Sequence, residues 1–317
     1  MSDTPHLLLP WAAATPQSQP HALQGLQLPQ LERLLKRLSP LPADVQDEES
    51  FSPPHERALG RALGLGSADG RIPFAAWHAA RTGLGGEAPG TAWAFVTPCH
   101  WQVRTDHVTL SNPEDLQLGE DESRALLAAM APWFAQDGIA LHYAQPGRWL
   151  ASGAPLAGIA TASLDRVVQR DVRAWLSDAP AAAPLRRLHS EMQMLLYTHA
   201  LNDAREARGL APVNAFWLHG AGALPPGLAP AEPPQVEDSL RAPALREDWP
   251  AWRAAWQALD AGPIAALAER AAQGEAVRLT LCGERAALTW QSAPRGLGAK
   301  ISSFFRPQRL SDVLSQL

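Results

Sequence analysis

The segment from Leu201 to Gly222, LNDAREARGLAPVNAFWLHGAG, constrains the fold of this 317-residue chain more than any other. Asn202 and Arg205 are three positions apart, so on a helix they project from one face. Gly209 can adopt the left-handed conformation that ends a helix. An apolar run and two glycines follow, which predicts a buried strand that leaves through a tight turn. The segment therefore predicts a helix, a sharp stop and a strand, as in α/β proteins.

Composition and charge limit the classes of function. The net charge of −5 and the pI of about 6.1 predict neither a nucleic-acid partner nor binding to a membrane surface. The two cysteines, Cys99 and Cys282, lie far apart and form no CxxC motif, which indicates reduced thiols. The apolar run near the N-terminus is short, lacks a basic leader and is broken by Pro10, so we predict neither a signal peptide nor a membrane span. These features predict a soluble, cytoplasmic protein.

The order of strand-like and helix-like runs divides the chain into three parts. Residues 1–90 are expected to form the first part of an α/β core, and residues 154–317 its C-terminal part with terminal helices and a hairpin. Between them, residues 91–153 have a β–β–α–β–β pattern around an amphipathic helix at 120–136. We therefore predict an α/β core with an inserted α+β lobe.

Apolar periodicity and turn residues predict the remaining elements. The expected strands and hairpin lie within 6–14, where the strand ends at Pro10, and at 214–218, 277–282 and 286–291. The expected helices lie at 28–38, 55–65, 73–81, 164–176, 184–208, 249–259, 263–273 and 307–317. The run at 184–208 is expected to be the longest helix. Within 249–259, Trp249, Trp252 and Trp256 have helical spacing, which is more typical of a buried core than of an interface.

Residues near the end of the predicted strand are candidates for binding an anion. In open α/β sheets the loops beyond the carboxyl ends of strands bind ligands, and a guanidinium suits a phosphate or carboxylate. We expect Arg205 to anchor the ligand, Asn202 and Asn214 to orient it, and His219 to lie at the rim of the pocket. Alternatively, Arg205 pairs with a neighbouring acid, and Asn214 and His219 serve local structure. On the first interpretation, Arg205→Ala weakens ligand binding and leaves folding intact.

The segment also resembles a known family. Archaeal-type cofactor-independent phosphoglycerate mutases, members of the alkaline phosphatase superfamily, share eight of its positions at fixed spacing. The matching residues are Asn202, Arg205, Gly209, Pro212, Asn214, Trp217, Gly220 and Gly222. The resemblance implies a reduced alkaline-phosphatase-like core. Proteobacterial RpfE-type regulatory proteins look nearer still, because they share the runs Ser52–Glu56 and Ile72–Ala76.

The resemblance fails where the family holds its metals. Those mutases transfer phosphate through a serine beside two divalent metals, and an Asp-Gly pair at the end of the first strand supplies one ligand. This chain has Pro10-Trp11 there, and it lacks the family's late Asp-x-x-Gly-His segment. We therefore predict no metal and no other cofactor. The pairs at His55-Glu56 and His189-x-Glu191 are expected to be solvated or capping residues on helices, and Asp69-Gly70 a tight turn.

Three hypotheses about function follow. The first is a mutase-like protein that has lost its two-metal site and acts by binding a small phosphorylated or carboxylated ligand, or a protein partner, in a regulatory role. The alternative is an active 2,3-bisphosphoglycerate-independent phosphoglycerate mutase or phosphatase that uses Mn or Zn. The third is an interaction protein that docks through its tryptophan-rich C-terminal segment. Metal content and turnover of 3-phosphoglycerate separate the first two hypotheses.

Overall fold

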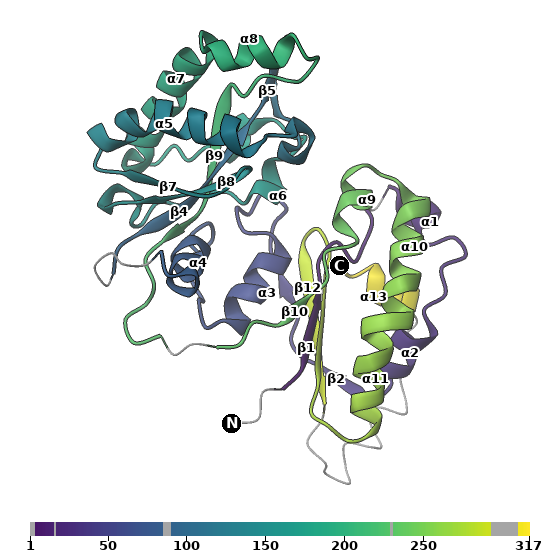
Figure 1. Cartoon of the computed structure of the whole chain (residues 1–317). Coiled ribbons are helices and arrows are strands. Elements are labelled where there is room, and N and C mark those ends of the chain that lie inside the picture. Colours follow the sequence, from purple (N-terminus) through teal and green to yellow (C-terminus); the bar gives the residue numbers. More distant parts are fainter. Residues whose placement is uncertain (1–3, 16, 85–89, 229–230, 293–309) are drawn as a thin grey trace. The chain divides into compact units, whose positions relative to one another are not determined.

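The computed structural model describes residues 4–15, 17–84, 90–228, 231–292 and 310–317. The chain forms two compact units, whose elements are labelled in Figure 1. The terminal unit comprises Met1–Glu49, Pro53–Leu63 and Pro230–Leu317, and the central unit comprises Ser50–Ser52 and Gly64–Ala229. Each unit combines helices with a β-sheet, which confirms the predicted α/β class.

A mixed six-stranded sheet organises the terminal unit. Its strands are β10 (Gln235–Val236), β1 (His6–Leu9), β11 (Arg278–Cys282), β12 (Ala286–Ser292) and β2 (Leu38–Pro40) in spatial order, with β3 (Asp44–Val45) also paired to β12. Strand β1 is parallel to both β10 and β11, whereas β12 is antiparallel to its three neighbours. The predicted first strand and the predicted C-terminal hairpin are confirmed.

Helices cover both faces of this sheet. They are α1 (Gln19–Ala22), α2 (Pro29–Leu35), α3 (Pro54–Ala62), α9 (Arg241–Leu245), α10 (Trp249–Leu259), the π-helical turn η5 (Asp260–Ile264), α11 (Ala265–Ala272) and α13 (Leu310–Leu314). Alternate residues of a strand point to opposite faces. Leu7 and Leu9 accordingly lie in one core with residues of α2, α10 and α11, whereas Leu8 packs against Ala58 of α3.

The tryptophan stripe on α10 lies inside the terminal unit. Trp249, Trp252 and Trp256 are all buried, and successive indoles meet edge to face at centroid distances of 6.1 and 5.9 Å. Such pairs add stabilisation beyond the burial of their area. The predicted core role is therefore confirmed, and these three indoles are not a free docking surface.

Asp260 joins two segments of this core, and its removal should destabilise the unit. Its carboxylate accepts hydrogen bonds from the backbone N–H groups of Gln30 (3.1 Å) and Leu31 (2.8 Å) in the first turn of α2. We expect Asp260→Ala to lower the free energy of unfolding by about 1–2 kcal/mol, because both donors lose a buried acceptor. Chemical denaturation measures this loss. Asp260→Asn keeps one acceptor oxygen and should cost clearly less; an equal cost for both variants would contradict the capping role.

An antiparallel four-stranded sheet organises the central unit. Its spatial order is β7 (Ala140–Gln145), β8 (Arg148–Ser152), β4 (Trp93–Cys99) and β9 (Ala215–Gly222). A separate two-stranded ribbon joins β5 (Trp101–Val103) to β6 (Val108–Leu110). All seven residues of β4 are buried, and this strand lies between β8 and β9.

The central unit has helices on both faces of its sheet. They are α4 (Phe74–Thr82), η1 (Pro113–Leu116), α5 (Glu120–Gln136), η2 (Ala154–Leu156), α6 (Leu164–Val167), η3 (Val172–Trp175), η4 (Pro180–Ala182), α7 (Ala183–Tyr197) and α8 (Ala200–Glu206). Val96 and Trp149 share a core with α5 and α7, whereas Phe95 and Leu150 share one with α4. No helix in the described ranges is both long enough and apolar enough to cross a bilayer.

Three features of the central unit differ from the expectations. Residues 164–176 form the short helix α6 and the separate 3-10 turn η3, and not one helix. The helix expected at 184–208 is interrupted after Tyr197, and the His199 imidazole accepts a hydrogen bond from Leu201 N at 3.2 Å to begin α8, so α5 is longer than either piece. Strand β9 pairs with β4 and not with a strand of the terminal unit. The completely buried β4 needs a strand on each side, which explains why 215–222 joins the sheet built by residues 93–152. The two units thus divide the chain at other positions than 90 and 153.

Candidate functional site

The helix-stop-strand segment has the predicted local form, and Asn202 holds it together. Gly209 has a φ of 73°, and β9 begins at Ala215. The Asn202 side chain is only 5% exposed. Its Nδ2 donates to the carbonyl oxygens of Leu196 (2.8 Å) and Val213 (2.9 Å), and its Oδ1 accepts from Val213 N (2.8 Å). These bonds use both ends of the amide to close the loop between α8 and β9.

Asn214 makes a second pair of internal bonds at the entrance to β9. Its Oδ1 accepts from the backbone N–H of Trp101 at 2.7 Å, and its Nδ2 donates to the Trp101 carbonyl at 2.9 Å. The side chain thereby imitates a strand and ties β9 to β5 across 113 positions of sequence. Both Asn202 and Asn214 are therefore engaged by the backbone of the central unit.

Arg205, the expected anion anchor, is fully buried, with 0% of the side chain exposed. Its Nη1 contacts Oε2 of Glu122 at 2.5 Å, its Nη2 donates to the carbonyl of Leu116 at 2.5 Å, and its Nε donates to the carbonyl of Ala211 at 2.9 Å. Arg208 pairs with the other oxygen of Glu122. Each nitrogen of the Arg205 guanidinium therefore has a partner inside the unit.

Glu122 is the residue that sequence reasoning did not connect to this segment. Burial alone would raise the pKa of its carboxyl, but the hydrogen bond from Arg208 and the charges of Arg205 and Arg208 outweigh that effect and hold the pKa below its usual range. The carboxylate thus stays ionised and neutralises a buried cation. It belongs to the first turn of α5, 83 positions from Arg205, so no local spacing could have identified the pair.

His219 lies on β9, apart from the other three candidates. Its Nε2 is 3.2 Å from the Thr97 hydroxyl oxygen, and its ring centroid is 5.3 Å from that of Phe95. Desolvation by burial lowers the pKa of His219 to about 4, so the ring is neutral at pH 7. Five strand positions separate it from Asn214, which is roughly 16 Å along an extended chain. The structure thus brings Asn202, Arg205 and Asn214 around one loop and leaves His219 at a distance.

The end of β1 is the place where the mutase family would hold a metal. Trp11 follows this strand in a left-handed conformation with a φ of 58°. Its carbonyl accepts a hydrogen bond from Trp252 Nε1 at 3.1 Å, and its ring lies 6.3 Å from that of His55. The backbone N–H of the next residue, Ala12, donates to the Cys282 carbonyl at 2.8 Å. Backbone bonds and an indole therefore fill this strand end.

These residues do not fit a two-metal site. Divalent metals of this kind require oxygen or nitrogen ligands from carboxylates and imidazoles, and an indole supplies none. Pro10, Trp11 and Ala12 offer no such side chain at the strand end. Within the described ranges, no group of three His, Cys, Asp or Glu side chains is placed to hold a metal ion.

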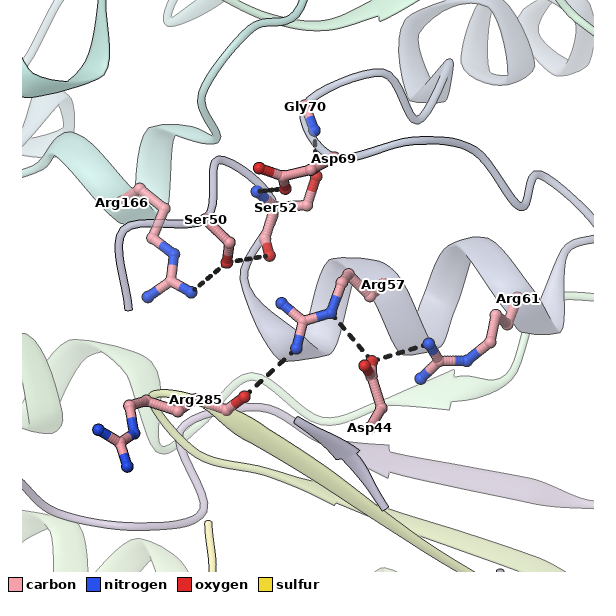
Figure 2. A network of polar contacts seen from close by, with 9 residues as sticks. All are labelled: Asp44, Ser50, Ser52, Arg57, Arg61, Asp69, Gly70, Arg166 and Arg285. Atoms are coloured by element: carbon pink, nitrogen blue, oxygen red, sulfur yellow. Dashed lines mark hydrogen bonds and ion pairs between the residues drawn. The ribbon is translucent and has the colours of Figure 1, made fainter. Parts of the chain in front are cut away.

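Figure 2 shows a polar network that includes Ser52, the first residue of the run Ser52–Glu56, and Arg57, which follows that run. In the terminal unit, Asp44 accepts hydrogen bonds from Arg57 Nε (2.9 Å) and Arg61 Nη1 (2.7 Å), and Arg57 also donates to the Arg285 carbonyl at 3.3 Å. Burial would raise the pKa of Asp44, but the two arginines outweigh it and keep the pKa below its usual range. This half of the network fixes α3 to the edge strand β3.

The other half of Figure 2 belongs to the central unit. Asp69 accepts from the backbone N–H groups of Phe51 and Ser52, both at 2.8 Å, and Gly70 N donates to the Ser52 hydroxyl at 2.8 Å. Gly70 has a φ of 70°, as the predicted tight turn requires. Arg166 Nη2 donates to the hydroxyl of Ser50 at 3.1 Å. Asp69-Gly70 is thus confirmed as a turn, and its hydrogen bonds hold the segment 50–52 in place.

A small pocket, partly open to solvent, lies in the central unit beside β9 and α7. Its wall includes Thr161, Trp175, Leu185, Arg186, His189 and Trp217. The expectation that His189 is a solvated or capping residue is wrong, because its side chain is only 8% exposed. It stacks on Phe216 at a centroid distance of 4.3 Å and on Trp101 at 5.4 Å, and burial lowers the pKa of His189 to about 4. The three-residue spacing of Arg186 and His189 was the signal in the sequence that could have indicated this pocket.

Comparisons with known proteins do not assign the chain to a family. No family model matches the chain, and no curated protein matches it significantly. Among solved structures, a cofactor-independent phosphoglycerate mutase from Thermoplasma acidophilum is similar over 99% of this chain and 100% of its own, with 13% identity and a TM-score of 0.36. The PH0037 protein from Pyrococcus horikoshii is similar over 95% of this chain and 90% of its own, with 11% identity and a TM-score of 0.44. Both TM-scores are below 0.5, so neither superposition identifies an activity or a site.

Proposed function

We propose that this chain is a phosphoglycerate-mutase-like protein that has lost two-metal phosphoryl transfer and acts by binding a ligand or partner. The observation that carries this proposal is the end of β1, where Trp11 and its backbone bonds stand in place of a metal-binding carboxylate. Two metals neutralise the phosphate and activate the nucleophile in this chemistry, so one missing ligand set removes the reaction.

The hydrogen bonds of the motif around Arg205 also support a binding role without phosphoryl transfer. Its asparagines and its arginine bond the loop, α5 and β9 of their own unit. Contacts of this kind support a fold shared with the mutase family through common ancestry. A shared fold alone does not establish a shared chemical activity. We therefore infer a binding or regulatory role, in a cytoplasmic protein, for the family-like architecture. The pocket beside α7 is a concave feature of the same unit.

Metal content and turnover test the proposal together. We expect the protein, purified without chelators and incubated with Mn²⁺ or Zn²⁺ before desalting, to retain no stoichiometric metal. It should not convert 3-phosphoglycerate to 2-phosphoglycerate, because no ligand set at the end of β1 can hold the ions. An active cofactor-independent mutase assayed in parallel is the positive control. Retention of about two ions per chain together with turnover would establish the metal-dependent mutase instead.

A further inference from the structure

The pocket beside α7 has walls suited to a flat apolar ligand. Trp175 and Trp217 contribute indoles, and Ile159, Leu185 and Leu218 contribute aliphatic side chains. The Trp217 indole is held in place because its Nε1 donates to the Ala162 carbonyl at 2.9 Å. Aromatic rings pack favourably on indoles in offset or edge-to-face arrangements. The walls thus favour an aromatic body over a polar one.

One charge in the pocket wall lacks a counter-ion. Arg186 Nη1 donates to the carbonyl oxygens of Ser177 (2.6 Å) and Ala179 (3.1 Å), which orient the guanidinium without neutralising it. Within the described part of the chain, Arg186 has no carboxylate partner, and no Asp or Glu is among the residues that line the pocket. A carboxylate on the ligand would form charge-assisted hydrogen bonds with this guanidinium.

His189 provides a second polar group in the wall. Stacking on Phe216 and Trp101 occupies the faces of the imidazole, so its edge is what a ligand can meet. Its Nδ1 is enclosed without a hydrogen-bond partner, and neither ring nitrogen bonds to another residue that the structure describes. Because the enclosed Nδ1 has no surface that a ligand could reach, Nε2 is the ring nitrogen available to a hydrogen-bonding ligand.

From the indoles, the unpaired guanidinium and the imidazole edge, we propose that this pocket binds a small aromatic monocarboxylate. The ring lies against Trp175 and Trp217, and the carboxylate meets Arg186, with His189 as the neighbouring hydrogen-bonding group. This inference rests on the proposed binding role and specifies its ligand class. It places the ligand beside α7, whereas the sequence alone suggested a pocket around Arg205.

Calorimetric titration of the full chain with matched probes tests the ligand class. Benzoate is the probe, benzamide has the same ring without the charge, cyclohexanecarboxylate has the charge without the aromatic ring, and inorganic phosphate is the alternative anion. We expect benzoate to bind about tenfold more tightly than benzamide, and more tightly than cyclohexanecarboxylate or phosphate. Equal affinity for benzoate and benzamide, stronger binding of phosphate, or no benzoate binding at millimolar concentration would each overturn the proposal.

Variants locate the site. Arg186→Gln should weaken benzoate about tenfold and leave benzamide unchanged, so that the two affinities become equal. Arg187→Gln is the matched control, because Arg187 is the next residue on α7 and pairs with Asp137 outside the pocket wall. His189→Phe keeps an aromatic ring between Phe216 and Trp101 and should weaken both probes. If Arg187→Gln weakened benzoate as much as Arg186→Gln, a general charge effect would replace the proposed site.

These outcomes are independent of the metal experiment. Two bound metals with turnover would overturn the proposed function and leave the benzoate measurements to stand or fall by themselves. Failure of benzoate to bind, in a chain that also holds no metal, would overturn the ligand class alone.

Discussion

Replacing Arg205 with alanine is expected to lower the free energy of unfolding by about 3–5 kcal/mol. The guanidinium is completely buried and bonds Glu122 and the carbonyls of Leu116 and Ala211. Its removal takes a donor from each of two carbonyl oxygens and leaves Glu122 with the exposed Arg208 and the backbone of Gly119 as partners. Urea denaturation followed by tryptophan fluorescence and circular dichroism measures the loss. This expectation replaces the one from sequence, in which the same substitution weakened ligand binding and left folding intact.

Arg208→Ala is the matched control for this prediction. Arg208 pairs with the same carboxylate from the surface, where its side chain is 55% exposed. Exposed ion pairs contribute little, so the control should cost less than about 1 kcal/mol. A stable Arg205→Ala protein would show that the buried pair is not structural. If that protein had also lost affinity for a phosphorylated or carboxylated ligand, the anion pocket expected from the sequence would be correct.

Between pH 7 and pH 4 the protein is expected to lose about 3 kcal/mol less unfolding free energy when His189 is replaced with phenylalanine. The pKa of His189 is about 4 in the folded protein, against 6.5 for an ordinary histidine, because burial disfavours the charged ring. Above pH 6.5 the ring is neutral in both the folded and the unfolded protein, so protonation of His189 costs no stability there. As the pH falls toward 4, the unfolded chain binds a proton that the folded protein does not, so stability is lost across this window.

The measurement compares free energies of unfolding at pH 7 and pH 4. His6 and His219 also have pKa values lowered to about 4, so the wild type retains a steep dependence, and the difference between variants is the informative quantity. His189→Gln separates titration from packing. It should flatten the dependence as much as His189→Phe, although the two variants differ in absolute stability. A dependence as steep as that of the wild type in both variants would show that His189 is not buried as a neutral ring.

Local features were predictable because their causes are local. Gly209 adopts the left-handed conformation that ends a helix, and Asp69-Gly70 forms its turn from its own side chain and backbone. The spacing of Trp249, Trp252 and Trp256 places all three indoles on one face, whatever that face packs against. The C-terminal hairpin likewise depends on short-range alternation and a turn.

The candidate site depended on distant parts of the chain. The sequence alone determined that Arg205 lies on a helix beside a strand, but it did not determine whether the guanidinium meets a ligand or a residue of this protein. Tertiary structure decided this by bringing Glu122 from α5 against it, 83 positions away. In the same way, pairing of β9 with β4 placed Trp217 beside α7 and formed the pocket around His189. Spacing along a chain specifies which side chains share a face, whereas burial, pairing and pKa depend on which distant segments cover that face.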